Sequence, residues 1–325
     1  MGKRRHQRVQ EALRSWAAAL DKSIIGHRVD PPPIPKGAHL DVLRLWTRER
    51  DGVSGRAAGR LATLAVEAGL DRVAVEAVRS KTDGERLTGI EAAGRLGLDE
   101  VWDDLVRHLR SGRAPLWERA GVALVRISPG RALELLLALL VAGDVPASAP
   151  ALARVIATAP ESARTTAIGA VLFDMPPVPQ ACVLRALGSA PTPSLLPIVR
   201  RILRLLDVLD VAAVDVVAGC ITALGAAGDA SDAVRVRGLA SHPAWTVRLE
   251  AAVALGALDG DARALRAMAT DDVEWLVRRA AVDSLRALGQ DAPSLAPEPA
   301  PVVEGPAEVR LVVTEEPWSV LDLAD

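Results

Sequence analysis

Two short segments, thirty residues apart, each combine a tryptophan with arginine. The first contains Trp245 and Arg248, and the second contains Trp275, Arg278 and Arg279. Tryptophan and arginine are the residue types most enriched in protein-binding hot spots. One interpretation is that these residues anchor a partner on one rim of the protein. The alternative, favoured by their equivalent positions, is that each tryptophan packs under the turn of its own helical unit.

Residue types that could catalyse a reaction are present but not at suitable spacings. Cys182 and Cys220 each lie inside an apolar helical pattern, which predicts buried free thiols. Phosphate loops, metal-binding helices and dinucleotide-type glycine fingerprints are missing from the sequence. The histidines have no acid or cysteine partner at metal-ligand spacing, and they are His6, His27, His39, His108 and His242. We therefore expect no catalytic residue, no metal site and no cofactor.

The elements that position the tryptophan and arginine residues are helices that repeat along the chain. Val247, Ala251, Leu255 and Leu258 have the spacing of one helix face. The same stripe recurs thirty residues later. Its third position recurs along the chain at separations of 28 to 37 residues, at Leu96, Leu124, Val155, Leu187, Leu224, Leu255 and Leu285. A period near 31 residues is typical of stacked helix-turn-helix units.

A second helical pattern lies between the repeated stripes. It covers residues 101–110, 131–141, 195–206, 233–240 and 262–269. Tyrosine is absent and phenylalanine occurs once, whereas the strong helix formers alanine and leucine are abundant. A single hairpin cannot bury its own apolar faces, so neighbouring hairpins must stack. We predict an all-α fold, a right-handed α-solenoid of about seven to eight helical hairpins.

Charge and proline content divide the chain into three parts. Residues 1–37 read as a basic helix with a Pro-rich linker, residues 38–289 as the solenoid, and residues 290–325 as a disordered acidic tail with a terminal apolar segment. Residues 51–290 are close to neutral, so we do not expect nucleic acid as a partner. The prolines between residues 145 and 193 predict a bend or a degenerate repeat there.

The two ends of the chain carry the remaining candidate binding residues. Lys3, Arg4, Arg5 and Arg8 could hold an anionic membrane surface, an interpretation that Arg14 and Trp16 would extend; the alternative is a solvated helix end. In the tail, Trp318 and Leu321 belong to an acidic and apolar segment of the kind that folds on a partner. Equally, this segment could dock back and cap the last repeat.

The segment Val247-Arg248-x-x-Ala251-Ala252-x-Ala254-Leu255-Gly256 resembles the second helix of the HEAT repeat. This resemblance implies an α-solenoid whose second helices line a concave face. It also implies that Arg248 and Arg278 contribute to a polar ladder between neighbouring repeats. Residues 40–46 and 92–97 are similar to bacterial HEAT-repeat proteins of unassigned function.

From these patterns we expect a non-catalytic scaffold or adaptor for a protein partner. No secretory signal or membrane span is visible, so we expect a cytoplasmic protein in a bacterium, held near the inner membrane by its basic N-terminus. An apolar span encoded upstream would make it membrane-anchored. The alternative function is a HEAT-like enzyme, either a DNA base-excision glycosylase or a bilin lyase.

Overall fold

The computed structural model describes residues 2–146, 148–206, 210–258 and 261–295, and all regular structure within these ranges is helical. The four short 3₁₀ segments are η1 (Asp99–Val101), η2 (Leu172–Asp174), η3 (Pro193–Leu195) and η4 (Val211–Ala213). The α-helices are α1 (Gly2–Ile25), α2 (His39–Glu49), α3 (Gly55–Glu67), α4 (Leu70–Val78), α5 (Asp83–Leu96), α6 (Trp102–Arg110), α7 (Leu116–Ile127), α8 (Pro129–Ala142), α9 (Ala149–Ala157), α10 (Glu161–Val171), α11 (Pro177–Ser189), α12 (Leu196–Leu205), α13 (Val214–Ala227), α14 (Ala230–Arg237), α15 (Trp245–Ala257), α16 (Ala262–Asp271) and α17 (Trp275–Ala287).

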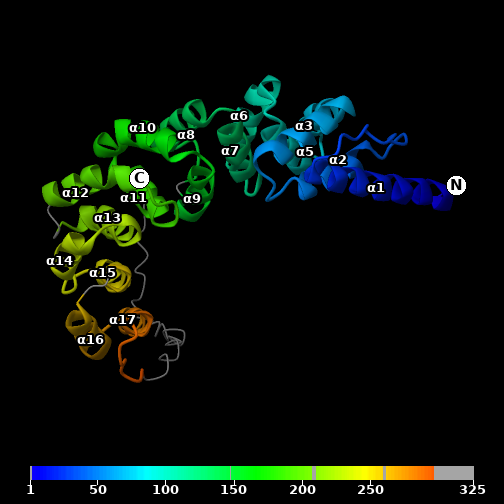
Figure 1. Cartoon of the computed structure of the whole chain (residues 1–325). Helices are drawn as coiled ribbons and strands as arrows, with labels where there is room; N and C mark the ends of the chain where they lie inside the picture. The colour runs from blue at the N-terminus through cyan, green and yellow to red at the C-terminus, as the bar shows by residue number, and fades with distance from the viewer. Residues whose placement is uncertain (1, 147, 207–209, 259–260, 296–325) are drawn as a thin grey trace, which may run out of the picture.

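From α4 onward the helices form a curved row of antiparallel hairpins (Figure 1). The odd-numbered helices α5 to α17 contact one another in sequence and line the inner side of the curve. The even-numbered helices α4 to α16 lie behind them on the outer side. Taken in chain order, the described part of the row consists of seven successive pairs of helices, from α4/α5 to α16/α17. The prediction of an all-α solenoid is confirmed.

The stripe positions that define the repeat form the shared core of the row. Leu124, Val155, Leu187, Leu224, Leu255 and Leu285 are all at most 3 % exposed and belong to one continuous apolar cluster that runs from Val78 to Leu285. Leu96, the first of the series, is half-buried. Because each hairpin shares this cluster with the next, burial along the row is continuous. Leu70, Ala74 and Ala92 of the first hairpin belong to a second cluster, which they form with α1, α2 and α3.

Small residues allow the inner helices to approach each other closely. A Cβ added to Gly225 would lie 2.8 Å from the Cβ of Ala254, and one added to Gly256 would lie 2.6 Å from the Cβ of Ser284. Each of these glycines directly follows the stripe leucine of its helix. The inner helices therefore pack backbone against small side chain, which accounts for the abundance of alanine and glycine in them.

The N-terminal helix packs on the start of the row. The second half of α1 lies against α2 and α3, and Trp16 and Leu20 are fully buried there. Trp46 is also buried, and its indole nitrogen donates a hydrogen bond to the Leu61 carbonyl at 2.9 Å. The expectation that Trp16 extends a membrane-binding surface is wrong, because its side chain has no exposed area.

The proline-rich middle keeps its inner helices. Pro150 and Pro177 lie in the first turns of α9 and α11, where the missing backbone N–H costs no helical hydrogen bond. Both helices take their place among the inner helices, but the outer helices behind them are less regular, because α8 and α10 contact each other more than they contact α9 and α11. The row does change direction around α10 to α12 (Figure 1), in line with the predicted bend.

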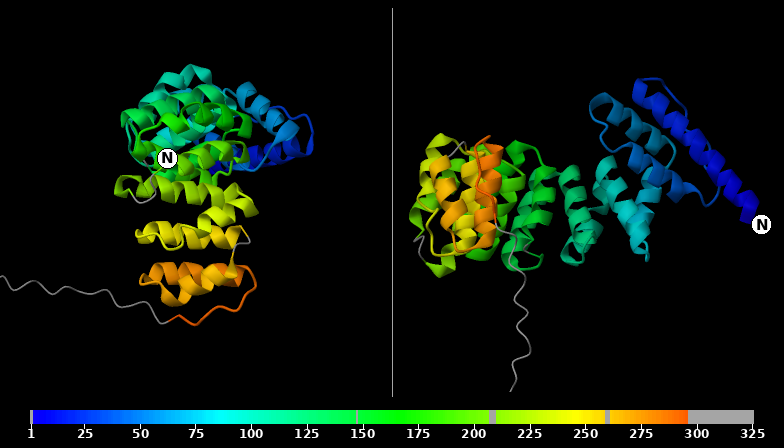
Figure 2. Two further views of the ribbon diagram at one scale, coloured as in Figure 1. Left: turned by 90° about the vertical axis from the view of Figure 1, so that its left-hand side faces the viewer. Right: turned by 90° about the horizontal axis from the view of Figure 1, so that it is seen from below.

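The chain after α17 folds across the open end of the row. Residues 288–295 run beneath α16 and α17 (Figure 2), and Leu288, Ala292 and Leu295 pack on the apolar cluster. Arg266 in α16 donates a hydrogen bond to the Gln290 side chain at 2.9 Å. The last hairpin is thus covered by the segment that directly follows it, whereas residues 296–325 lie outside the described structure.

Among the described residues, no helix has both the length and the apolar character needed to span a bilayer.

Candidate functional site

Arg248 lies at the junction between the last two hairpins and ties them together. Its Nε and Nη2 atoms donate hydrogen bonds to the two carboxylate oxygens of Asp272, at 2.7 and 2.9 Å. Its Nη1 atom donates to the backbone carbonyls of His242 and Pro243 at 2.9 and 3.0 Å. The two paired side chains are only 12 % and 6 % exposed. The inter-repeat role that the sequence resemblance implies for Arg248 is confirmed, and little of this guanidinium is left for a partner.

Arg278, one repeat later, makes the same hydrogen bonds to turn carbonyls but not the inter-repeat ion pair. Its Nη1 atom donates to the carbonyls of Asp272 and Val273 at 2.7 and 3.0 Å, the same two turn positions that Arg248 uses in its own repeat. Within the described residues Arg278 forms no inter-repeat ion pair like that of Arg248, because α17 is the last helix of the row. Arg278 therefore fixes the turn into its own helix.

The two tryptophans open α15 and α17 and differ in their surroundings. Trp245 is 39 % exposed. Trp275 is half-buried, and the Arg279 guanidinium lies over its ring at 5.3 Å from the centroid. A cation over a tryptophan face contributes about 0.5–1 kcal/mol at an exposed site. The structure thus brings Trp275 and Arg279 together, but they belong to a different hairpin from Trp245.

The inner face of the row is the surface formed by the exposed positions of α5 to α17. It contains three well-exposed large apolar side chains, Val178 in α11, Val253 in α15 and Leu276 in α17, at 70, 51 and 45 % exposure. Close to Val178, residues of α9, α11 and α13 enclose a hollow of about 410 Å³ whose edge is formed by Arg185 and Asp215. The sequence analysis did not single out these positions, because an isolated exposed valine or leucine has no recognisable pattern.

Most charged groups on the inner face are paired with one another. Arg154 of α9 donates two hydrogen bonds to Glu118 of α7, at 2.5 and 2.7 Å. Arg185 of α11 donates to Asp215 of α13 at 2.8 Å. These pairs join successive inner helices and neutralise each other's charge. The middle of the inner face therefore has no excess of cations, and it lacks the row of phosphate-neutralising groups that nucleic-acid binding requires.

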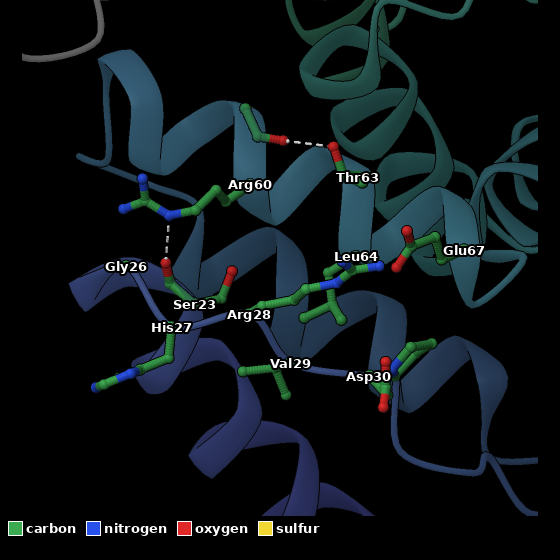
Figure 3. Close-up of a pocket in the computed structure, with 12 residues that line it drawn as sticks. Ser23, Gly26, His27, Arg28, Val29, Asp30, Arg60, Thr63, Leu64 and Glu67 are labelled. Atoms are coloured by element: carbon green, nitrogen blue, oxygen red, sulfur yellow. Dashed lines mark hydrogen bonds between the residues drawn. The ribbon is translucent and has the colours of Figure 1, made fainter.

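A separate hollow of about 710 Å³ lies where α1 ends beside α3 (Figure 3). Arg60 of α3 extends to this end and donates from Nε and Nη2 to the carbonyls of Ser23 and Ile24, both at 2.7 Å. A cation is stabilising there because the last carbonyls of a helix lack partners. Arg60 therefore joins the end of α1 to α3.

The thiols and the described histidines show no catalytic arrangement. Burial raises the pKa of the Cys182 thiol to about 11 and that of Cys220 to about 12, so both are neutral at neutral pH. His242 is buried and accepts a hydrogen bond from the Ala244 backbone through Nδ1 at 3.0 Å. Within the described ranges, no three side chains of histidine, cysteine, aspartate or glutamate are grouped so that they could hold a metal ion.

The remaining candidate residues lie at the two ends of the chain. Arg8 is exposed in the first half of α1. The N-terminal end of this helix projects beyond its neighbours (Figure 2). Lys3, Arg4 and Arg5 are within α1, but their side chains are not described. Trp318 and Leu321 lie outside the described residues.

Comparison with known protein families gives one match, and it falls on the C-terminal half of the row. A sequence model of HEAT repeats matches residues 202–286, the segment from the end of α12 to the end of α17. Residues 202–286 of the chain are HEAT repeats. HEAT repeats commonly mediate protein–protein interactions, and the family generally acts as a non-catalytic scaffold. No curated protein matches the chain as a whole or in part.

Proposed function

We propose that this HEAT-repeat protein is a non-catalytic scaffold or adaptor that holds a protein partner on its inner face. The observation that carries the proposal is the exposure of Val178, Val253 and Leu276 on that face. Large apolar side chains exposed on a concave surface lose unfavourable contact with water when a partner covers them. The neighbouring charges are already paired, so a partner with an apolar surface would not leave an unpaired charge buried at the interface.

The surface contributed by α15 and α17 is the most complete part of this proposed site. Trp245 adds a large, partly exposed ring at the start of α15, and Arg279 adds a guanidinium held against Trp275. Aromatic and arginine side chains of this kind supply much of the binding energy in protein interfaces. Arg248 and Arg278 support the site by fixing the turns from which these residues project.

The proposal is tested by placing a charge on the inner face. Val253→Glu combined with Leu276→Glu should abolish recovery of partner proteins from a lysate of the source organism, because a carboxylate in a desolvated interface costs several kcal/mol. The matched control is Val234→Glu on the outer helix α14, whose side chain is 60 % exposed. Loss of recovery with the control variant, or unchanged recovery with the inner-face variant, would refute the proposal.

We also propose that the projecting start of α1 keeps the scaffold near an anionic membrane. The exposed Arg8 and the basic sequence that precedes it support this proposal, since each cation close to an anionic surface contributes about 1 kcal/mol. The full chain should co-float with vesicles that contain phosphatidylglycerol, and the variant with glutamine at positions 3, 4, 5 and 8 should not. Equal flotation of the two proteins would contradict the membrane role.

A further inference from the structure

The outer helices α8 and α10 enclose an apolar hollow of about 650 Å³ on the side of the row opposite the inner face (Figure 1). The two helices contact each other directly, and the start of the connection from α10 to α11 also lines the hollow. We call this hollow the outer groove, and its apolar lining includes Leu137, Ala138, Val141, Ala167, Ala170 and Val171. Its volume lies within the range of about 300–1,000 Å³ that is typical of binding pockets.

The outer groove occupies a part of the outer side that lacks charge. Residues 135–142 of α8 and 165–171 of α10 include no charged residue. By contrast, the outer helices α6, α12, α14 and α16 each expose two arginines. Val141 and Val171 are instead exposed to water at 45 and 38 %. Stacking of the hairpins does not require exposed valines on the outer side, and an exposed apolar surface of this kind marks a site of interaction.

Small side chains form part of the surface of the outer groove. Ala138 and Ala170 are both exposed there. Because the distance between packed helices depends on the side chains at their contact, methyl groups allow another helix to approach closely. Along α8 the lining positions run from Glu134 to Val141, which is about 10 Å at 1.5 Å per residue. The groove therefore has room for about two turns of a third helix laid against α8 and α10.

Two unpaired carboxylates accompany this apolar surface. Glu134 and Asp174 line the groove, and both are exposed. Among the described residues, neither side chain forms a hydrogen bond or an ion pair. Arg131, one turn before Glu134, lies over the tryptophan ring at the start of α6, and Arg201 lies over the ring of Phe173. No basic side chain lines the groove, so both carboxylates are available to a cation from outside the chain.

We propose that the outer groove binds an amphipathic helical segment of a partner protein, with lysine or arginine beside its apolar face. Apolar side chains at i, i+3, i+4 and i+7 of that segment fill the groove. The basic side chains pair with Glu134 and Asp174, which favours a basic segment over an acidic one. This site does not depend on the inner face, and a segment bound in it leaves the inner face open to a second partner.

The test is a selection of helical peptides from a random phage-displayed library on the full chain. The library is first depleted on the double variant Ala138→Arg, Ala170→Arg, whose long side chains fill the groove and repel cations. Depletion removes peptides that bind any other surface, including the inner face. The enriched peptides should carry apolar residues at helical spacing and at least one lysine or arginine beside them.

Calorimetric titration of one enriched peptide then separates the two parts of the site. Binding to the double arginine variant should be at least about 100-fold weaker than to the unmodified chain, because the groove is filled. Glu134→Gln combined with Asp174→Asn should weaken binding about 2- to 30-fold, the effect of two exposed ion pairs. Ala230→Arg, at an exposed alanine of the outer helix α14, is the matched control and should bind as the unmodified chain does.

Four results would overturn the proposal. They are the absence of any enriched peptide, enrichment of acidic peptides, unchanged affinity in the Glu134→Gln, Asp174→Asn variant, and equal weakening by Ala230→Arg. Binding should persist in the variant Val253→Glu, Leu276→Glu, so failure of the inner-face proposal would not affect this result. If circular dichroism shows that the double arginine variant does not fold, Val141→Gln replaces it in both steps and should weaken binding at least about 10-fold.

Discussion

At the residue scale, Arg248 and Asp272 show how the hairpins are joined. Their fork-like contact is almost fully buried, and it continues from the Arg248 guanidinium into two backbone carbonyls of the preceding turn. Removing one partner of a buried pair leaves the other charge buried and unpaired. The free-energy cost of that charge is larger than the net stabilisation that the intact pair contributes. The contact therefore fixes the angle between neighbouring hairpins as well as their stability.

The pair also makes stability depend on pH. Burial alone would raise the pKa of the Asp272 carboxyl, but hydrogen bonds from Arg248 and from the Glu274 backbone lower the pKa overall. The folded pKa thus lies below the unfolded value of about 3.9. The stabilisation is fully present above that value and is lost as the pH falls through the folded pKa.

Asp272→Asn should lower the free energy of unfolding at pH 7 by about 3–5 kcal/mol. In the same variant, the free energy of unfolding should decrease less steeply as the pH falls below about 4. Urea denaturation followed by circular dichroism at both pH values measures the two effects. The matched control is Asp283→Asn, whose side chain is 57 % exposed and whose ion pairs should contribute less than about 1 kcal/mol. Equal losses in the two variants would contradict this account of the pair.

At the element scale, the spacing of the inner helices depends on small residues. Gly256→Ala should destabilise the protein by about 1–3 kcal/mol, because the new methyl group would lie 2.6 Å from Ser284. Gly59→Ala in α3 should instead stabilise it by about 0.5–1 kcal/mol, since an added Cβ meets nothing within 4 Å there. Thermal unfolding of both variants provides the comparison. A stabilising Gly256→Ala would show that the inner helices are not in close contact.

The elements were the part of the structure best predicted from the sequence. The stripe of Val247, Ala251 and Leu255 recurs because every inner helix buries the same face, so its period was visible without coordinates. The helix α10 was missed, since only Ala167 and Ile168 of its residues are buried and two positions give a weak pattern.

The candidate site was less predictable for a physical reason. Arg248 was identified because an arginine recurs at the same place thirty residues later, at Arg278. Glu134 and Asp174 come from different elements and line one groove only after stacking, and exposed residues such as Val253 lie outside the buried stripe. Sequence periodicity reports what is buried in every repeat, whereas a binding surface depends on what differs between repeats.

At the scale of the whole molecule, the row of hairpins has two unlike halves on its inner face. Ion-paired arginines collect at the end formed by α2, α5 and α7, and exposed apolar side chains lie between α11 and α17. Among the described residues, the most extensive helix-to-helix contacts join elements that are neighbours along the row, as expected of a repeat protein. Stability should therefore be a local property, set by each hairpin and the two interfaces beside it.

Native-state hydrogen exchange of a single core variant tests this organisation most directly. Leu285→Ala in α17 removes a fully buried side chain and should cost about 2–5 kcal/mol. If the hairpins form one row, amide protection should fall in α16, α17 and the adjoining α15, while α5 to α7 should keep the protection of the unmodified protein. Leu124→Ala in α7 should instead lower amide protection in α7 and the helices beside it, while α16 and α17 should keep the protection of the unmodified protein. An equal loss of protection along the whole chain from either variant would contradict the stacked-row architecture.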